Sequence, residues 1–369
     1  MDSIVREVIS RAPEEPRLTE VPTASIGIQT EDAELERILA SLRTNIKIIG
    51  IGGGGSNTID RLVEAGIVGA ELYAANTDAQ HLLTIRSPHK VLLGRRATRG
   101  LGAGALPQVG EEAAREAAEE VRQIVHGADM VFITCGLGGG TGTGGAPIVA
   151  QLAKEAGALT IAVCTFPFRA EGAIRAENAE YGLEKLRAFA DTVVVIPNDK
   201  LLEIVPRLAL NAAFRVADDV LMRAIKGITE IITKPGLVNL DFNDIKTIMK
   251  GGGVAMIGLG ESDSENRAED AIHAAINSPL IDVDVSAATS ALVNVTGGND
   301  MTVAEAEQVA EIVQSRISPN ARIIWGAAVD PSVQHKLRVM LILTGVRSKQ
   351  ILGPGEHLRA RETGVDFVR

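Results

Sequence analysis

Cysteines, aromatic residues and long apolar runs are all scarce in this chain. The 369-residue sequence has 2 cysteines and 3% aromatic residues. Its longest apolar runs fall far short of the ~20 residues that a membrane helix needs, so we expect no direct membrane insertion. The N-terminal residues lack the apolar stretch of a signal peptide. Cys135 and Cys164 each close a strand-like run, which predicts buried free thiols in a reducing cytoplasm and not a disulfide.

Metal-ligand spacings, excess positive charge and a phosphate-binding lysine motif are also missing. The six histidines and two cysteines show no CxxC, HxxxH or HExxH spacing, so we expect no metal site built by the protein alone. The net charge of -10 argues against a nucleic-acid partner and against adhesion to anionic lipid. Because no G-x-x-x-x-G-K-[ST] motif occurs, any phosphate site must rely mainly on backbone amides and hydroxyls.

Alternating strand and helix patterns begin at Asn45. Residues 1–44, rich in charge and proline, are expected to form a partly disordered extension. Strands are expected at 46–49, 70–75, 130–135, 160–164 and 192–196, and helices at 57–65, 111–126, 148–156 and 176–190. This order predicts a first α/β domain over 45–209, with a parallel sheet, helices on both faces and ligands at the carboxyl ends of the strands.

The pattern changes after residue 209. A long central helix is expected over 210–234, ended by Pro235 and Gly236. A smaller α+β domain is expected over 235–350, with strands at 253–260, 291–296, 322–328 and 337–343. Its helix at 302–315 opens with the capping box Thr302-x-x-Glu305. Residues 351–369 are expected to form a short tail.

Three glycine-rich segments follow predicted strands. The first, Gly50-x-Gly-x-x-Gly55, fits either a tight helix–strand turn or a diphosphate held by backbone amides at a helix N-terminus. The second, GLGGGTGTGGAP at 136–147, holds seven glycines and two threonines in twelve positions, and Pro147 suits the first turn of the next helix. The third spans Gly100–Ala105. Two such loops on one sheet edge indicate a phosphate chain held from both sides.

These segments resemble the three glycine loops of the FtsZ family, the tubulin-like cell-division GTPases. The run Gly138–Gly144 is the most specific element, and the likeness extends over about residues 45–350. It implies a tubulin-like fold with a Rossmann-type GTPase domain, GTP or GDP as ligand, and Mg²⁺ bound with the nucleotide. The nucleotide contacts that it implies from the loops are Gly52, Gly53, Gly54, Ser56, Asn57, Gly102, Ala103, Gly104, Gly138, Gly139, Gly140, Thr141, Gly142, Thr143 and Gly144.

The resemblance also implies a cellular role. Members assemble head to tail into filaments of the cell-division ring, so the expected partners are further copies of this chain and division-ring or membrane-anchor proteins. The expected location is the cytoplasm at the division site. Bacterial members usually continue through a long linker to a peptide that binds membrane anchors, whereas only a short tail follows the last predicted strand here.

Further positions match family contacts one at a time. Asn76 and Asp78 match a loop near the phosphates and metal, Glu171 and Arg175 match ribose and phosphate contacts, and Asn198 matches another nucleotide contact. Without the motif, each of these charged residues would be explained more simply as a solvent-exposed residue that follows a strand.

Phe214 and Asp218 lie four residues apart on the long helix and therefore share a face. A ring and a carboxylate there suit guanine, whose N1–H and 2-amino group are adjacent donors that adenine lacks. Bacterial members usually carry asparagine at the position of Asp218, and the aspartate resembles archaeal members. The simpler alternative is an ion pair between Asp218 and Arg215 on a solvated face.

Asn239, Asp241 and Asp244 match the catalytic loop of the family. By themselves, Asp241 and Asp244 are more typical of a helix cap. The long helix places them ~20 Å from the base that Asp218 would hold, so the resemblance implies that they act on the nucleotide of the next subunit. They would orient the attacking water, with Asn239 assisting.

Two other functions compete with a polymerising GTPase. A nicotinamide-dependent oxidoreductase could use Gly50–Gly55, but it needs an acidic residue at the end of the second strand, where this chain has Ala75 and Asn76. A scaffold that binds GTP without significant hydrolysis would not need Asp241 and Asp244.

Overall fold

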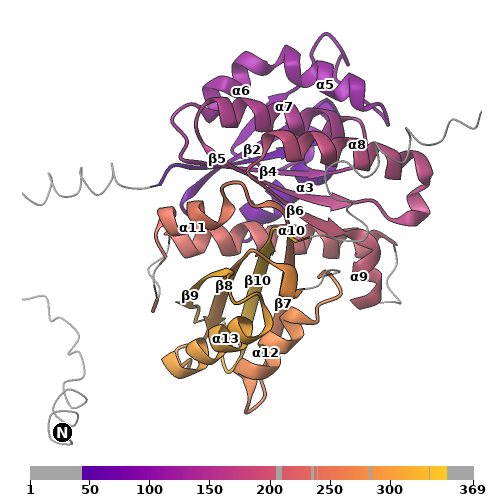
Figure 1. Cartoon of the computed structure of the whole chain (residues 1–369). Helices are drawn as coiled ribbons and strands as arrows, with labels where there is room; N and C mark the ends of the chain where they lie inside the picture. Colours follow the sequence, from indigo (N-terminus) through magenta and orange to yellow (C-terminus); the bar gives the residue numbers. More distant parts are fainter. Residues whose placement is uncertain are drawn as a thin grey trace, which may run out of the picture. The chain divides into compact units, whose positions relative to one another are not determined.

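The computed structural model describes residues 44–204, 210–233, 237–238, 240–281, 285–331 and 333–346, all within one compact unit, Thr44–Arg369 (Figure 1). Among these residues, ten strands form one sheet in the order β3-β2-β1-β4-β5-β6-β7-β10-β8-β9. The expected N-terminal extension over 1–44, apart from Thr44, and the expected tail over 351–369 lie outside the described residues.

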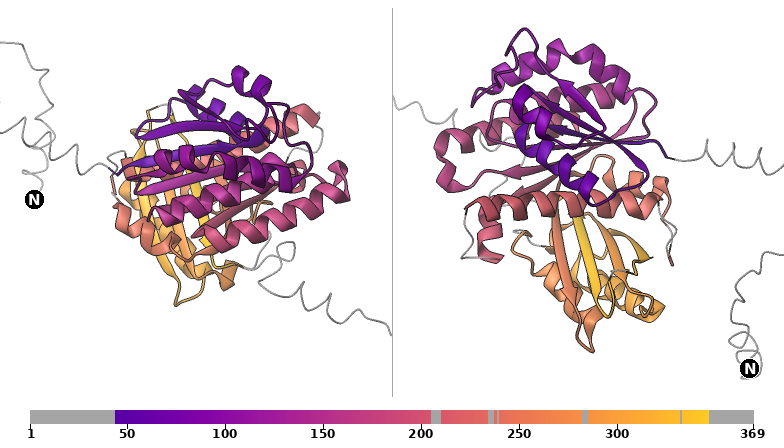
Figure 2. Two further views of the ribbon diagram at one scale, coloured as in Figure 1. Left: turned by 90° about the horizontal axis from the view of Figure 1, so that it is seen from above. Right: turned by 180° about the vertical axis from the view of Figure 1, so that it is seen from behind.

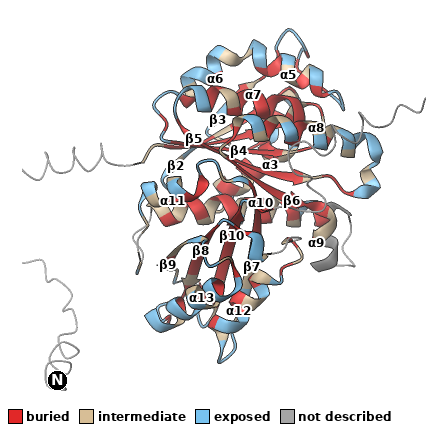
Figure 3. Ribbon diagram, in the orientation of Figure 1, coloured by how far each residue is buried: buried red, intermediate tan, exposed pale blue. Residues whose placement is uncertain are grey.

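The first six strands are parallel and mostly buried on both faces (Figure 3). Such burial explains why β1, β4 and β5 are mostly apolar and show no regular alternation of polar and apolar residues. Strand order reverses at β1, which pairs with β2 on one side and with β4 on the other. A ligand crevice is expected at the carboxyl ends of the strands at such a point. The strands are β1 Ile46–Ile51, β2 Ala70–Asn76, β3 His89–Leu92, β4 Met130–Gly136, β5 Leu159–Phe166 and β6 Thr192–Pro197.

Helices cover both faces of this parallel region. Helices α5 to α8 pack on the face that carries Ile49 and Ile51, and α3 and α10 pack on the face that carries Ile46 and Ile48. The expected single helix over 111–126 is wrong, because α5 and α6 meet at Ala117, whose φ of -90° and ψ of 8° interrupt the helix. The elements are α3 Gly52–Glu64, α4 Ala79–Thr84, α5 Pro107–Glu116, α6 Ala118–Val125, α7 Thr141–Glu155, η1 Arg169–Glu171, α8 Ala173–Phe189, α9 Asn198–Ile204 and α10 Leu210–Thr233.

Helix α10 lies between the parallel region and the strands that follow it (Figure 2, right). Its buried residues Leu221, Ile225 and Ile228 share an apolar core with Leu292 and Ile342 from the second region. The two regions are also joined in the sheet, because Thr192–Val194 of β6 pairs in parallel with Gly253–Ala255 of β7. The later elements are α11 Phe242–Met249, β7 Gly253–Ser262, α12 Arg267–Ile276, η2 Val285–Ala287, β8 Ser290–Gly297, α13 Val303–Arg316, β9 Arg322–Val329 and β10 Leu337–Thr344.

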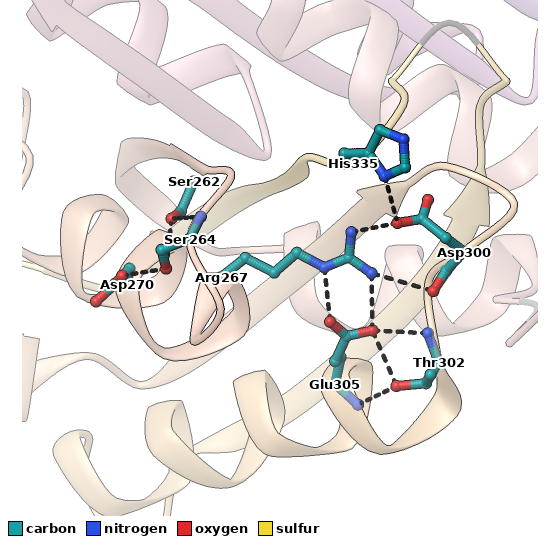
Figure 4. Close-up of polar contacts among 8 residues, drawn as sticks. All are labelled: Ser262, Ser264, Arg267, Asp270, Asp300, Thr302, Glu305 and His335. Carbon is teal, nitrogen blue, oxygen red and sulfur yellow. Dashed lines mark hydrogen bonds and ion pairs between the residues drawn. The ribbon is translucent and has the colours of Figure 1, made fainter.

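A charged cluster fastens α12 to α13 in the second region (Figure 4). The guanidinium of Arg267 lies 2.6 Å from carboxylate oxygens of both Asp300 and Glu305. Glu305 also accepts from the backbone N–H of Thr302 at 2.8 Å, and the Thr302 hydroxyl accepts from the N–H of Glu305 at 3.2 Å. The predicted capping box is therefore confirmed, and it sets the N-terminus of α13 against α12.

The two cysteines are free and fully buried on neighbouring strands, as predicted. Burial raises the pKa of the Cys135 thiol to about 12, so it stays protonated and unreactive at neutral pH. Across the described part of the chain, no helix combines the length and apolar character needed to cross a bilayer.

Candidate nucleotide site

The first two glycine segments contain the first residues of helices, so neither is a loop over its whole length. Strand β1 passes directly into α3, whose first residue, Gly52, has a φ of +74°. After β4, Gly138 has a φ of +104° and α7 begins at Thr141. The expected helix starts at 57 and 148 are therefore too late, and Pro147 lies inside α7 and not in its first turn. Glycine tolerates positive φ, which lets the chain turn from strand to helix within very few residues.

The N-termini of α3 and α7 meet. A Cβ built on Gly52 would lie 2.9 Å from the backbone nitrogen of Gly142 in the first turn of α7. Neither helix has a side-chain cap or an acidic residue in its first turn, whereas α4 and α13 are capped by Asp78 and Thr302. The first backbone N–H groups of a helix have no partner within it, so two uncapped ends at one place form a site suited to an anion.

The glycines of the site serve two different needs. Side chains on Gly140, Gly142 and Gly144 would collide with backbone oxygens of neighbouring segments, so protein packing itself requires these glycines. A Cβ on Gly53 or Gly139 would meet nothing within 4 Å. Packing places no demand on these two glycines, and a side chain at either would extend into open space.

The third glycine segment packs against the second. The N–H of Gly140 donates to the carbonyl of Gly104 at 2.7 Å, and a Cβ on Gly140 would lie 2.7 Å from the carbonyl oxygen of Ala103. Gly102 donates to the carbonyl of Thr77 at 3.1 Å. The three glycine segments predicted from the sequence are thus brought together at the carboxyl ends of β1, β2 and β4.

The two threonines of the second segment have different environments. Thr143 is fully buried, and its hydroxyl accepts from the N–H of Gly138 at 2.9 Å, so it shapes the turn from within. The hydroxyls of Thr141 and Thr77 lie 2.6 Å apart. Asn178 donates to the carbonyls of Ala105 and Gly138 at 3.0 and 3.2 Å. Thr77 lies in the loop between Asn76 and Asp78 that the resemblance identified, but no role was predicted for it. Sequence reasoning missed Asn178, since a lone polar residue outside the glycine runs carries no local signal.

Two buried polar atoms at the site lack partners. Ser56 Oγ on α3 and Asn198 Oδ1 at the start of α9 make no hydrogen bond with any residue that the structure describes. A buried polar group without a partner is costly, so both atoms fit a site that is completed by a ligand. Glu171 and Arg175 pair with each other at 2.8 Å, and Glu171 also accepts from the N–H of Phe168 at 3.0 Å.

Phe214 and Asp218 lie on one face of α10, as predicted. The Phe214 ring packs edge to face on Phe168, with centroids 5.1 Å apart. Asp218 pairs with Arg61 of α3, and the Nε–Oδ2 distance is 3.7 Å. The alternative pairing with Arg215 is not the one observed. Burial raises the pKa of Asp218 to about 6, although the positive charge of Arg61 opposes this shift.

A hydrogen-bonded chain links β2 to α3. Asn76 Oδ1 accepts from the N–H groups of Thr77 and Asp78, at 2.8 and 3.3 Å. Asn76 Nδ2 lies 3.1 Å from His81 Nδ1, and His81 Nε2 lies 3.1 Å from Asn57 Oδ1. Asp78 caps α4 by accepting from the N–H of His81 at 3.0 Å. His81 was not predicted from the sequence.

Asp241 and Asp244 lie at the start of α11. Asp241 Oδ1 accepts from the N–H of Asp244 at 2.8 Å, and Asp244 Oδ2 accepts from the N–H of Asp241 at 3.2 Å. The two carboxylates therefore form a helix cap, which was the simpler expectation, and each keeps a second oxygen outside it. Asn239 lies outside the described residues. Helix α10 continues beyond Asp218 to its last residue, Thr233, a length of about 22 Å at 1.5 Å per residue, so the chain reaches these carboxylates only after the far end of this helix.

Two family models match the chain. The GTPase domain of the Tubulin/FtsZ family matches residues 45–206, and the C-terminal domain of the FtsZ family matches residues 253–347. The chain is 58% identical over 369 residues to "Cell division protein FtsZ 1" of Archaeoglobus fulgidus, and 54% identical over 380 residues to "Cell division protein FtsZ" of Haloferax mediterranei, with 100% of both chains covered in each comparison. A solved "FtsZ dimer, empty" from M. jannaschii is 55% identical, with a TM-score of 0.82 over 85% of this chain and 92% of that one.

Proposed function

Since the chain belongs to the tubulin/FtsZ family and is a cell-division GTPase, we propose that it binds GTP where α3 and α7 meet and hydrolyses it between subunits of a head-to-tail filament. The observation that carries the proposal is the convergence of the two uncapped helix N-termini at Gly52 and Gly142. They offer backbone N–H groups and partial positive charge to a chain of phosphates without any lysine.

In this proposal the glycine segments hold the phosphates. Gly52, Gly53, Gly54 and Ser56 contribute from α3, and Gly138–Gly144 contributes from the turn before α7 and its first residues. Gly102, Ala103 and Gly104 cover the terminal phosphate from the third segment, while Asn76 and Asp78 border the phosphates from the end of β2. The open space at Gly53 and Gly139 supports a close approach of the ligand to the backbone.

The base is held by Phe214, Asp218 and Asn57. The ribose and the phosphates beside it are held by Glu171, Arg175 and Asn198. The ionised carboxylate of Asp218 accepts from guanine N1–H and the 2-amino group, a pair of donors that adenine lacks. Magnesium is proposed to bind with the nucleotide, where it offsets phosphate charge.

Asp241, Asp244 and Asn239 are proposed to complete the site of the adjacent copy in the filament. About 22 Å of helix separates Asp218 from the end of α10 at Thr233, and the chain reaches Asp241 and Asp244 only after that end, which supports action on a neighbour and not on the same chain. The carboxylate oxygens that lie outside the cap accept hydrogen bonds from the attacking water and orient it. Such a contact joins two different faces of one chain and therefore propagates into a filament.

We further propose that the filament works at the division site in the cytoplasm with division-ring or membrane-anchor proteins. Light scattering tests assembly and phosphate release tests hydrolysis. Both are measured in parallel samples that contain GTP, GDP or ATP. We expect increased scattering and phosphate release with GTP, and neither with GDP or ATP. Hydrolysis without any assembly would overturn the intersubunit site, and assembly without hydrolysis would favour a GTP-binding scaffold.

A further inference from the structure

His81 controls which atoms Asn57 can present to a ligand. The argument begins at Asn76, whose Oδ1 faces the backbone N–H groups of Thr77 and Asp78. Backbone N–H groups only donate, so the atom facing them must be the amide oxygen. The other end of the Asn76 amide, which faces His81 Nδ1 at 3.1 Å, is therefore the NH₂ group and a donor.

The orientation of Asn76 fixes the proton on the His81 ring. Because Asn76 Nδ2 donates, His81 Nδ1 must accept, which places the ring proton of the neutral imidazole on Nε2. His81 Nε2–H then donates to Asn57 Oδ1 at 3.1 Å. The backbone of His81 is fixed by the Asp78 cap on its N–H and by the Thr84 hydroxyl, which donates to its carbonyl at 2.7 Å, while the ring is held by its hydrogen bonds to Asn76 and Asn57.

Within the described part of the chain, the side-chain amide of Asn57 is therefore hydrogen-bonded through its oxygen only. Its oxygen is occupied by His81, and no described residue hydrogen-bonds its NH₂ group. Asn57 lies four residues before Arg61 on α3, on the face that meets Asp218 of α10. A ligand edge in contact with both Asp218 and Asn57 would meet carboxylate acceptors from the first and N–H donors from the second.

We propose that His81 is a positioning residue that fixes the Asn57 amide with its donors toward the purine, and so selects a 6-oxo over a 6-amino group. This inference rests on the proposed function, since it places the purine between Asn57 and Asp218. A 6-oxo group accepts from Asn57 Nδ2, whereas a 6-amino group sets donor against donor. Without His81 the Asn57 amide is free to turn its oxygen outward and accept from the 6-amino group.

The test compares GDP with the diphosphate of 2,6-diaminopurine riboside, which keeps the 2-amino group, replaces the 6-oxo by a 6-amino group and lacks the N1 proton. Calorimetry on the full chain should show GDP preferred by about tenfold or more, because the 6-amino group at Asn57 and the missing N1–H at Asp218 both leave polar groups unpaired. In His81→Leu this ratio should fall by about threefold or more, since the Asn57 amide can turn, while GDP stays preferred through the N1–H contact with Asp218. His81→Gln should keep the wild-type ratio, because its amide oxygen and nitrogen replace Nδ1 and Nε2. The matched control His126→Leu should also keep it.

A folded His81→Leu protein with the wild-type ratio would overturn the proposal. A second measurement needs no variant: long-range ¹H–¹⁵N correlation of the histidine rings in the ligand-free chain at pH 7.5 should place the His81 proton on Nε2. A proton on Nδ1, or on both nitrogens, would also overturn it. A wild-type chain without affinity for GDP would instead overturn the proposed function.

Discussion

Arg61 Nε on α3 lies 3.7 Å from Asp218 Oδ2 on α10, and this pair joins the glycine-rich helix to the helix that carries the proposed base contacts. The side chains are 27% and 15% exposed. Burial nevertheless outweighs the attraction of Arg61, since the pKa of Asp218 is raised to about 6. Burial therefore disfavours the ionised form of Asp218 in the ligand-free protein. The two adjacent donors of a guanine edge would supply hydrogen bonds to this carboxylate.

Ligand-free stability should change with pH through Asp218. With its pKa raised from 3.8 to about 6, the folded state binds this proton more tightly than the unfolded state. The contribution of Asp218 to the unfolding free energy therefore decreases as pH rises from about 4 to about 6 and then levels off. Asp218→Asn should remove this dependence in thermal unfolding at pH 5 and 7.5. Asp219→Asn, at an exposed pair with Arg223, is the control and should keep it.

Nucleotide affinity should change with pH in the opposite direction. Guanine needs the ionised carboxylate, so GDP affinity should decrease as pH falls through about 6. At pH 7.5, guanine should be favoured over adenine by about 1–3 kcal/mol, because the wrong edge leaves buried groups unpaired. Equal affinities for GTP and ATP by calorimetry would contradict the assignment of Asp218 to the base.

Gly139→Val should abolish nucleotide binding without unfolding the chain. A Cβ at Gly139 meets nothing within 4 Å, so the new side chain should enter only the space assigned to the phosphates. GDP affinity and the unfolding midpoint provide the two measurements. Ala156→Val, at the opposite end of α7, is the control and should change neither. Normal GDP affinity in a folded Gly139→Val protein would mean that this segment is purely structural.

GTPase activity per subunit should fall toward zero on dilution. If Asp241 and Asp244 complete the site of a neighbour, a monomer lacks part of its active site. Asparagine is the right replacement because Asp241→Asn and Asp244→Asn retain an oxygen for the helix cap. Each variant should bind GTP, assemble into long-lived filaments, and lower the activity of wild-type subunits mixed with it.

Phosphate release measured across a dilution series, with Asp263→Asn on an exposed loop as the control, checks this expectation. Activity per subunit that stays constant well below the assembly threshold would show that one chain holds a complete site.

Arg267→Met should destabilise the second region. The Arg267 side chain is 11% exposed and pairs with Asp300 and Glu305, so its loss leaves two facing carboxylates without a cation. We expect about 2 kcal/mol of lost stability in denaturant unfolding, less than for a fully buried pair because Asp300 remains partly in water. Arg122→Met, at an exposed pair with Glu119, should cost at most about 0.5 kcal/mol.

The local pattern of the sequence determined most of the strands and the family. Buried runs such as Met130–Gly136 and the glycine motif at 138–144 are contiguous, so they were identified without a structure. The short edge strand β3 and the helices α4 and α12 were missed because few residues carry their pattern. The start of α3 at Gly52 was also missed, since glycine is a poor helix former whose place here depends on the α7 backbone beside it.

Tertiary structure alone decided which side chains meet. The sequence offered only Arg215, a near neighbour, as the alternative ion-pair partner of Asp218, but the packing of α10 on α3 brings Asp218 to Arg61 instead. The same packing and the cap of α4 join Asn57, His81 and Asn76. Periodicity shows which face of an element is buried, but not which residues of another element lie opposite. That choice depends on how distant elements pack, and packing also sets the burial that raises the pKa of Asp218.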